Sequence, residues 1–375
     1  MRQEVHLGYG SLKEVRKVLD QGSREAVFIV ADKAAYAGAV AGLESALAGR
    51  RTLVFSEFAP NPHLEDVRTG IDRFRDFGPD VVLAVGGGTA IDMAKLINTF
   101  AHQDADPIAL VKRETRIEKK GDLLIAIPTT AGTGSEATHF AVIYVERVKY
   151  SVAHEHVLPD YAIVDPALTF GVPPAVAAST GMDALSQGIE SLWSVNSTSE
   201  SRRYAREAIR LAWNSLEKAV TDPDAASKAS MAEAAHFSGK AINISKTTAP
   251  HALSYFFTSY FNVPHGHAVG LTLGGFLVFN DRVTPADIAD GRGVAFVRRQ
   301  VSEIVSILGA KDAVDASNKV DSLMQAVGLE TDLSKLGFIP ERDLDQLLSN
   351  VNVERLDNNP RRVEQHAISS ILLKR

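Results

Sequence analysis

The chain has 375 residues, of which 45% are hydrophobic and 23% charged, and its formal net charge is −6 at pH 7. Because this balance is acidic and the basic residues are scattered, nucleic-acid binding has little electrostatic support. No apolar run is long enough to cross a bilayer. The chain has no cysteine, which excludes thiolate zinc sites, cysteine nucleophiles and iron–sulfur clusters, so any metal must be held by His, Asp, Glu or amide oxygens.

Residues 1–168 alternate short apolar runs with segments of helix length. Continuous apolar strands separated by helices indicate a mostly parallel sheet covered on both faces, so we expect an α/β dinucleotide-binding domain here. The segment from 149 to 165 is typical either of an antiparallel pair or of a last strand, and both alternatives stay open. The expected strands lie within residues 26–32, 51–58, 80–88, 122–130 and 161–166.

A glycine-rich loop follows the expected strand at 80–88. Glycines let the backbone approach a phosphate closely, and the N-terminus of the helix that follows offers N–H groups and a favourable dipole, so a pyrophosphate fits there. The alternative is a tight strand-to-helix turn without a ligand, since the motif is not G-x-G-x-x-G. Thr89 and Asp92 have the spacing of a helix N-terminal capping pair, and we assign both, with the glycines of this loop, to cofactor binding. The loop residues are Gly86, Gly87 and Gly88.

A second polar loop, "PTTAGTGSEAT" at 128–138, follows another apolar strand. Ligands of open α/β sheets bind outside the carboxyl ends of the strands, so two such loops favour a dinucleotide. Asp32 ends a strand where an acid accepts ribose hydroxyls and repels a 2′-phosphate, which favours NAD(H) over NADP(H); the alternative is a cap on the next helix. The predicted cofactor residues of this half also include Thr129, Thr130, Thr133, Ser135 and Lys149.

From residue 169 to 375 the pattern changes to long amphipathic stretches, such as 200–220 and 292–310. A chain of this length is expected to form two domains, and the second should be all-helical.

Four residues of this second half suggest a metal site. Asp183 and Gln187 share a helix face, and His251 and His265 stand fourteen positions apart. Each alone has an ordinary explanation, because an acid in a helix is usually solvated and a lone histidine is usually not a ligand. Together, one carboxylate and two imidazoles suit Fe²⁺, Zn²⁺, Mn²⁺ or Co²⁺.

Four motifs, "GGGTAIDMAK", "PTTAGTGSEAT", "STGMDALSQGIES" and "PHALSYFFTSYFNVPHGHAVG", have the order and spacing of the iron-containing (group III) alcohol dehydrogenases, which this chain therefore resembles. The resemblance implies the dehydroquinate synthase-like fold: a dinucleotide-binding domain followed by an all-helical domain with one divalent metal, Fe²⁺ or Zn²⁺. It implies an NAD(P)-dependent oxidoreductase in which the metal polarises an alcohol or aldehyde oxygen. The family's ligands are an Asp, a His four residues later, and two His fourteen apart.

Asp183, His251 and His265 match three of these ligands, whereas Gln187 replaces the fourth. A Gln amide oxygen is a weaker donor than imidazole for such metals, so the ion is bound more loosely, is bound through three side chains and water, or is absent. We favour a catalytic metal, because an open site with three protein ligands is ordinary for catalysis. Tyr255 stands where many members have a second histidine near the nicotinamide. His267 is then the expected proton relay, and we assign both residues to catalysis.

Three further segments, "ATHFAVIY", "MDALSQGIESLWSVNSTSES" and "GKAINISKTTAPHALSY", resemble the phosphonoacetaldehyde reductase branch, which makes 2-hydroxyethylphosphonate. Lys246 precedes His251 closely and suits a substrate anion as a point charge, although an ordinary surface lysine is the alternative. Another anionic alcohol or sugar acid, or a cyclase of the dehydroquinate synthase type, are alternative functions. The other residues assigned to the anion are Asn243, Thr247 and His139.

The expected partners are a small-molecule substrate and a second copy of the chain in a dimer, with neither nucleic acid nor membrane. The first residues lack the basic-then-apolar signature of a signal peptide, so we expect a cytoplasmic protein.

Overall fold

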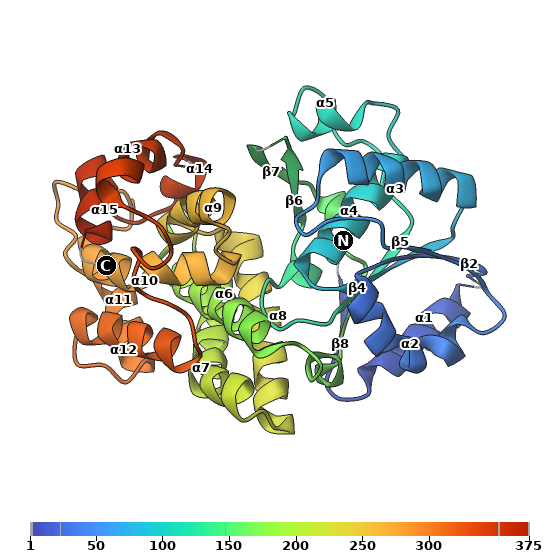
Figure 1. Ribbon diagram of the computed structural model, residues 1–375, viewed down its shortest axis with the longest axis horizontal. Helices are drawn as coiled ribbons and strands as arrows, with labels where there is room; N and C mark the ends of the chain where they lie inside the picture. Colours follow the sequence, from blue (N-terminus) through green and yellow to red (C-terminus); the bar gives the residue numbers. More distant parts are fainter. Residues whose placement is uncertain (1–2, 23, 147, 352, 374–375) are drawn as a thin grey trace. The chain divides into compact units, whose positions relative to one another are not determined.

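Six strands of the first half form one parallel sheet. The computed structural model describes residues 3–22, 24–146, 148–351 and 353–373 (Figure 1). The strand order is β1-β8-β5-β4-β2-β3, and every neighbouring pair is parallel. The strands are β1 (Glu4–Leu7), β2 (Ala26–Ala31), β3 (Arg51–Phe55), β4 (Val81–Gly86), β5 (Leu123–Pro128) and β8 (Tyr161–Val164).

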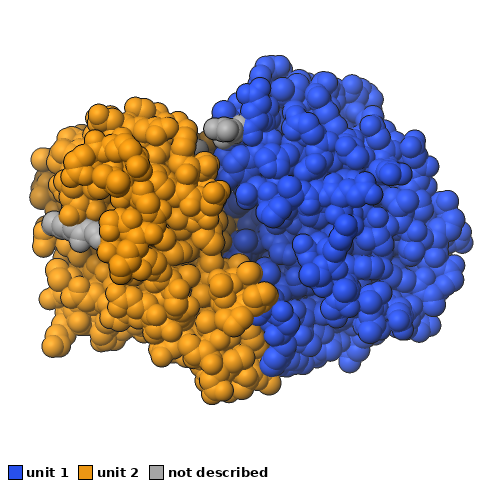
Figure 2. Space-filling model, in the orientation of Figure 1, with its two compact units in different colours: residues 1–172 blue, residues 173–375 orange. Residues whose placement is uncertain are grey.

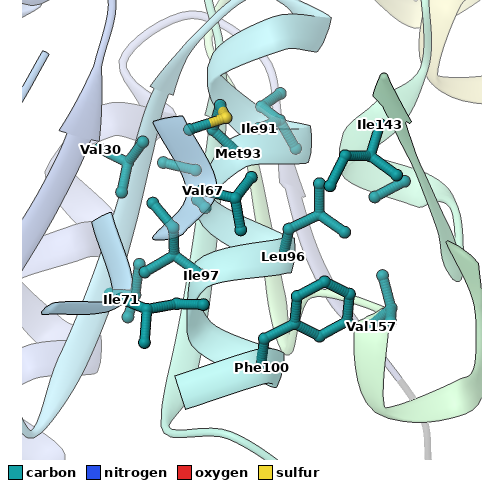
Figure 3. Packing of buried hydrophobic residues seen from close by; sticks show 14 of the residues in the cluster. Val30, Val67, Ile71, Ile91, Met93, Leu96, Ile97, Phe100, Ile143 and Val157 are labelled. Atoms are coloured by element: carbon teal, nitrogen blue, oxygen red, sulfur yellow. The ribbon is translucent and has the colours of Figure 1, made fainter. Parts of the chain in front are cut away.

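Helices cover both faces of this sheet because successive side chains of a strand point to opposite sides. Phe28 and Val30 of β2 pack with α3 (Leu64–Phe77) and α4 (Gly88–Ala101), and Figure 3 shows Val30 close to Val67 of α3 and Ile97 of α4. The alternate residues of β2 pack with α1 (Glu14–Gln21) and α2 (Lys33–Leu47). The prediction of a parallel sheet with both faces buried is confirmed.

The segment at 149–165 contributes to both of the structures left open by the sequence. β7 (Val148–Ala153) forms an antiparallel pair with β6 (Phe140–Val145), and β8 joins the parallel sheet. The short helix α5 (Pro107–Val111) precedes β5. The edge strand β1 was not expected, because its four residues alternate polar and apolar side chains and lack a continuous apolar run.

The chain divides into two units, residues 1–172 and residues 173–375, coloured blue and orange in Figure 2. The boundary expected at residue 168 lies within a short 3₁₀ helix, Pro166–Thr169, just before this division.

The second unit is helical throughout its described part, which contains no strand. Its central helix is α6, which packs against α7, α8 and α10 and is buried without interruption from Gly181 to Trp193. The helices are α6 (Pro174–Trp193), α7 (Ser199–Thr221), α8 (Ala225–Ser245), α9 (Ala249–Phe261), α10 (His265–Asp281), α11 (Val294–Ile307), α12 (Ala313–Ala326), α13 (Pro340–Ser349), α14 (Val353–Leu356) and α15 (Gln365–Leu372). Among the described residues, we find no helix with both the length and the apolar character that crossing a membrane requires.

Candidate active site

The two predicted cofactor loops lie side by side at the carboxyl ends of β4 and β5. Gly86 pairs with Pro128 in the sheet, and the Thr129 N–H donates to the Gly86 carbonyl at 3.0 Å. Gly86 has φ of 151°, and a Cβ there would lie 2.7 Å from Ala90 Cβ, so both the backbone conformation and the space require glycine. The strand order reverses between β2 and β4, which is where open α/β sheets bind ligands.

The glycines also bring the second loop against the start of α4. A Cβ at Gly88 would lie 2.8 Å from Thr133 Cγ2, and one at Gly87 would lie 3.3 Å from Thr130 Oγ1. The N-cap of α4 is Gly87, and no side chain caps this helix. The capping pair predicted for Thr89 and Asp92 is therefore wrong, since α4 begins too early for Thr89 to be its N-cap.

Asp92 instead joins a buried network with Lys95. Its carboxylate accepts from the Ser135 hydroxyl and, at 2.9 Å, from the Val142 N–H. Burial raises the pKa of this carboxyl against the opposing charges of Lys95 and Lys149, whose side chain comes from β7. The prediction that Asp92 contacts the cofactor remains untested; the contacts observed in the structure hold the second loop and β6 to α4.

Lys95 was not singled out by the sequence analysis, and it is fully buried. Its ammonium donates to Ser135 Oγ at 3.1 Å, to Thr138 Oγ1 at 3.0 Å and to the Phe140 carbonyl at 2.9 Å. Burial lowers its pKa to about 8. Lys95 is the last residue of the motif "GGGTAIDMAK" and looks like any lysine in a helix. Only the structure shows its burial.

Asp32 caps α2, as the alternative interpretation expected. Its Oδ1 accepts from the N–H groups of Ala34 at 2.9 Å and Ala35 at 3.0 Å. The side chain is exposed, and its Cβ is within 3.6 Å of a Cβ built on Gly86. The cap therefore stands beside the glycine loop, and contact with a ribose remains a prediction.

In the second unit, Asp183, His251 and His265 converge as predicted. One potential ligand atom from each lies within 4.8 Å of the other two. They come from α6, α9 and α10, and Asp183 and His251 are 2% and 4% exposed. One carboxylate and two imidazoles at this spacing fit a divalent Fe, Zn, Mn or Co ion, and no further set of three His, Asp or Glu groups in the described residues does so.

Gly266 explains how α10 comes close enough for His265 to reach Asp183. A Cβ on Gly266 would lie 1.9 Å from the Ser179 carbonyl and 2.7 Å from Asp183 Cβ, so only glycine permits this contact. Pro264 is the N-cap of α10 and places His265 as its first residue.

Glu190 completes the site and was missed by the sequence analysis. It is fully buried, its Oε2 accepts from His251 Nδ1, and its Oε1 accepts from Thr248 N at 3.0 Å and Thr248 Oγ1 at 2.8 Å. His251 Nε2 lies 3.2 Å from Asp183 Oδ1. Burial lowers the pKa of His251, but the charges and hydrogen bonds of Glu190 and Asp183 outweigh it and raise this pKa to about 10.

A signal for Glu190 existed in its spacing. Asp183, Gln187 and Glu190 stand at i, i+4 and i+7, which is one face of a helix. Gln187 lies on this face with 3% exposure, and its Oε1 accepts from Ser238 Oγ of α8 at 2.8 Å. Whether its amide oxygen also ligates a metal remains a prediction.

Of the two residues assigned to catalysis, Tyr255 contacts His265, and His267 follows it by two positions in α10. Tyr255 stacks on the His265 ring, with centroids 6.2 Å apart. His267 is buried; its backbone N–H donates to Ser179 Oγ at 3.2 Å, and its Nε2 donates to the Glu330 carbonyl at 2.6 Å. Burial lowers its pKa. This nitrogen therefore has a structural partner, and the relay role stays a prediction.

The residues assigned to a substrate anion are divided between the units. Lys246, at the end of α8, has φ of 58° and ψ of 175°, and its Nζ lies 3.5 Å from Glu354 Oε1. The Thr247 carbonyl accepts from Asn358 Nδ2 at 2.9 Å, and Asn243 is half-buried in α8. His139 belongs to the first unit, where its carbonyl accepts from the His154 N–H at 3.0 Å, whereas the other three belong to the second unit.

Comparison with known proteins assigns both units to one protein family. The family model "Iron-containing alcohol dehydrogenase" matches residues 3–166, and the model "Fe-containing alcohol dehydrogenase family, C-terminal" matches residues 177–375. The chain is 36% identical over 312 residues to phosphonoacetaldehyde reductase of Streptomyces viridochromogenes, covering 81% of this chain and 78% of that protein. It is 38% identical over 275 residues to long-chain-alcohol dehydrogenase 1 of Geobacillus thermodenitrificans, covering 72% and 69%.

A solved structure shows the same fold over nearly the whole chain. Sulfoacetaldehyde reductase from Bifidobacterium kashiwanohense, in complex with NAD⁺, superposes with a TM-score of 0.89 at 29% identity, covering 99% of this chain and 96% of that one. The expected fold is confirmed, and with it the resemblance drawn from the four motifs. The chain belongs to the iron-containing alcohol dehydrogenase family and is an oxidoreductase.

Proposed function

We propose that the protein is a metal-dependent, NAD(H)-linked reductase of phosphonoacetaldehyde, with 2-hydroxyethylphosphonate as its product. The observation that carries this proposal is a cation, Lys246, two residues before Thr248, which is hydrogen-bonded to the metal-site residue His251 through Glu190. Thr248 donates to Glu190, which in turn accepts from His251. The names of two relatives, a phosphonoacetaldehyde and a sulfoacetaldehyde reductase, support an aldehyde that carries an acidic group.

The reaction consumes an aldehyde, NADH and one proton and yields an alcohol and NAD⁺. A divalent ion held by Asp183, His251 and His265 would supply Lewis acidity toward the carbonyl oxygen, and NADH would supply the hydride. Glu190 accepts from His251 Nδ1, so Nε2 is the nitrogen that would bind the ion in place of its hydrogen. We assign the proton of the product alcohol to water or to His267.

The choice of cofactor rests on Asp32. A carboxylate at the end of β2, beside the glycine loop, repels a 2′-phosphate and therefore favours NAD(H) over NADP(H). The relative that is complexed with NAD⁺ supports this choice. For the metal we propose Fe²⁺ or Zn²⁺, because these ions suit a set of one carboxylate and two imidazoles.

Steady-state kinetics with purified, metal-loaded protein test the proposal. We expect kcat/KM for phosphonoacetaldehyde to exceed that for propanal, a neutral aldehyde with a methyl group in place of the phosphonate, by about 100-fold, the scale of two charge-assisted hydrogen bonds. Equal values would remove phosphonoacetaldehyde as the substrate.

A second candidate is an oxidoreductase of another small anionic substrate, favoured by the similarity to sulfoacetaldehyde reductase. The same kinetics with sulfoacetaldehyde distinguish the two, because a phosphonate carries a higher charge than a sulfonate. Family membership favours either candidate over a cyclase of the dehydroquinate synthase type.

A further inference from the structure

One charged side chain of the first unit is completely buried and has no part in the proposed reaction. This residue is Lys95 of α4. Its ammonium donates to Ser135 Oγ at 3.1 Å, to Thr138 Oγ1 at 3.0 Å and to the Phe140 carbonyl at 2.9 Å. An ammonium has three hydrogens, so these three acceptors use all of them. The acceptors follow one another along the second polar loop and into β6, so one charge on α4 fixes this whole stretch.

The acceptors of Lys95 are connected in turn to Asp92, one helical turn earlier. The Ser135 hydroxyl donates to Asp92 Oδ1, and Asp92 Oδ2 accepts from the Val142 N–H at 2.9 Å. Lys95 Nζ and Asp92 Oδ1 lie 3.8 Å apart. Because a hydroxyl has one hydrogen and Ser135 gives it to the carboxylate, its oxygen receives the hydrogen of the lysine. The charged amine and the carboxylate therefore hold the same loop together.

This network reaches the glycine loop through Thr133. The Ser135 N–H donates to Thr133 Oγ1 at 3.3 Å, and Thr133 Cγ2 lies 2.8 Å from the position of a Cβ built on Gly88. Between these two residues Gly134 has φ of 62°, in the left-handed region, so the loop bends sharply here. Lys95 is buried and does not itself reach a cofactor, but it holds the residues that are assigned to the cofactor.

Resting on the proposed function, we infer that Lys95 is a positioning residue for the cofactor: its charged amine holds residues 133–138 in the conformation that binds NAD(H). A neutral amine has only two hydrogens, so one of the three acceptors would lose its donor inside the protein, and the attraction to Asp92 would disappear. Thr133 and Ser135 would then lose their fixed position against the start of α4. Cofactor affinity therefore requires the proton on Lys95.

This proton is lost in a pH range that binding experiments reach. Burial lowers the pKa of Lys95 to about 8. The charges of Asp92 in α4 and of Glu136 in the second loop oppose this decrease, and Lys149 of β7 acts on the network through Asp92. The amine is charged below its pKa and neutral above it. Affinity for NADH should therefore fall as the pH rises through about 8, by up to about tenfold for each pH unit.

Titrations of NADH fluorescence with the full-length, metal-loaded enzyme, from about pH 7 to about pH 9.5, test this inference. Lys95→Met keeps the length of the side chain and removes its charge, so it should weaken NADH binding about 30-fold at about pH 7 and abolish the pH dependence. It should also raise KM for NADH while kcat at saturating NADH stays within about twofold of the wild type. Thr138→Val removes one acceptor of the charged amine, so the pH at which affinity begins to fall should move down by about one unit.

Lys112→Met is the matched control, because Lys112 is an exposed lysine of the same unit. It should keep both the affinity and the pH profile of the wild type. A wild type whose NADH affinity is constant over this range, together with unchanged affinity in Lys95→Met, would overturn the positioning role alone. If Lys95→Met does not fold, an unshifted pH profile in Thr138→Val would overturn it, since a general loss of stability does not move a pKa. A wild type that binds no NADH at any of these pH values would overturn the cofactor of the proposed function as well.

Discussion

Glu190 determines which nitrogen of His251 is available to a metal. Its carboxylate accepts a hydrogen bond from Nδ1, while Nε2 lies 3.2 Å from Asp183 Oδ1. Metal-binding histidines commonly donate their other N–H to a carboxylate, which fixes the ring and strengthens the ligand. Glu190 also accepts from both the N–H and the hydroxyl of Thr248, so the same side chain fixes the start of α9.

Glu190→Gln should weaken metal binding about 10- to 100-fold, the usual effect of losing such a carboxylate. The amide keeps the size of the side chain and can still accept from Thr248, so the fold should persist. Chelator competition for Zn²⁺ on metal-stripped protein measures the change, with the exposed Glu341→Gln as control. An unchanged Zn²⁺ affinity would show that His251 is oriented by its packing alone.

Gln187 stands where the resemblance to the family implies a fourth, histidine ligand. Its Oε1 accepts from Ser238 Oγ at 2.8 Å, and the same hydroxyl lies 2.9 Å from the Ala235 carbonyl. A hydroxyl has one hydrogen, so Ser238 has an alternative acceptor when the amide is removed.

Gln187→His should therefore tighten Zn²⁺ binding about 10-fold, because imidazole is a stronger donor than an amide and Ser238 keeps a partner. Chelator competition measures the affinity, and Ser238→Ala controls for the loss of the hydroxyl contact. Weaker binding in Gln187→His, with Ser238→Ala unchanged, would contradict the prediction and favour the amide oxygen as a ligand.

The sequence predicted residues whose types are unusual in their setting and missed those that look ordinary. Asp183, His251 and His265 stood out because they fall in family motifs. Glu190 and Lys95 are charged residues in helices, which are usually solvated, and only their burial distinguishes them. Burial depends on which helices pack together, and a single sequence does not specify that.

At the scale of elements, β2, β4 and β5 were predicted because each is a buried, continuous apolar run, whereas β1 and β6 were not predicted. The start of α4 was misplaced by one residue, because Gly87 is its N-cap and Gly88 is its first residue. The residue pattern did not predict this start, because glycine is common both in loops and at the N-cap of a helix. The close packing of α6 and α10 was equally hidden, because it depends on the absence of one side chain at Gly266.

Gly266→Ala should destabilise the second unit by about 3 kcal/mol or more, since overpacking of this severity forces the helices apart. It should also abolish Zn²⁺ binding, because His265 moves away from Asp183. Urea unfolding followed by circular dichroism and a Zn²⁺ titration measure the two effects. Gly291→Ala is the matched control, because a Cβ there meets no atom within 4 Å. Retained Zn²⁺ affinity in Gly266→Ala would mean that α10 does not need this contact to present His265.

At the scale of the whole molecule, the residues predicted to bind the metal and those predicted to bind the cofactor lie in different units. Asp183, His251, His265 and Glu190 all belong to residues 173–375, and every residue predicted to bind the cofactor belongs to residues 1–172. Each unit also has its own buried core, so each ligand should stabilise the unit that binds it.

Hydrogen exchange of the full-length, metal-stripped protein tests this division. Zn²⁺ should slow exchange in α6, α9 and the first turn of α10, because it fixes three side chains from these helices. NAD⁺ should slow exchange in residues 86–92 and 128–138, where the two loops meet at the start of α4. At 100 times the dissociation constant, either ligand contributes about 2.7 kcal/mol, enough to slow exchange by global opening of its unit about 100-fold. Protection by NAD⁺ confined to the second unit would contradict the assignment of the glycine loops to the cofactor, since those loops would then be only tight turns.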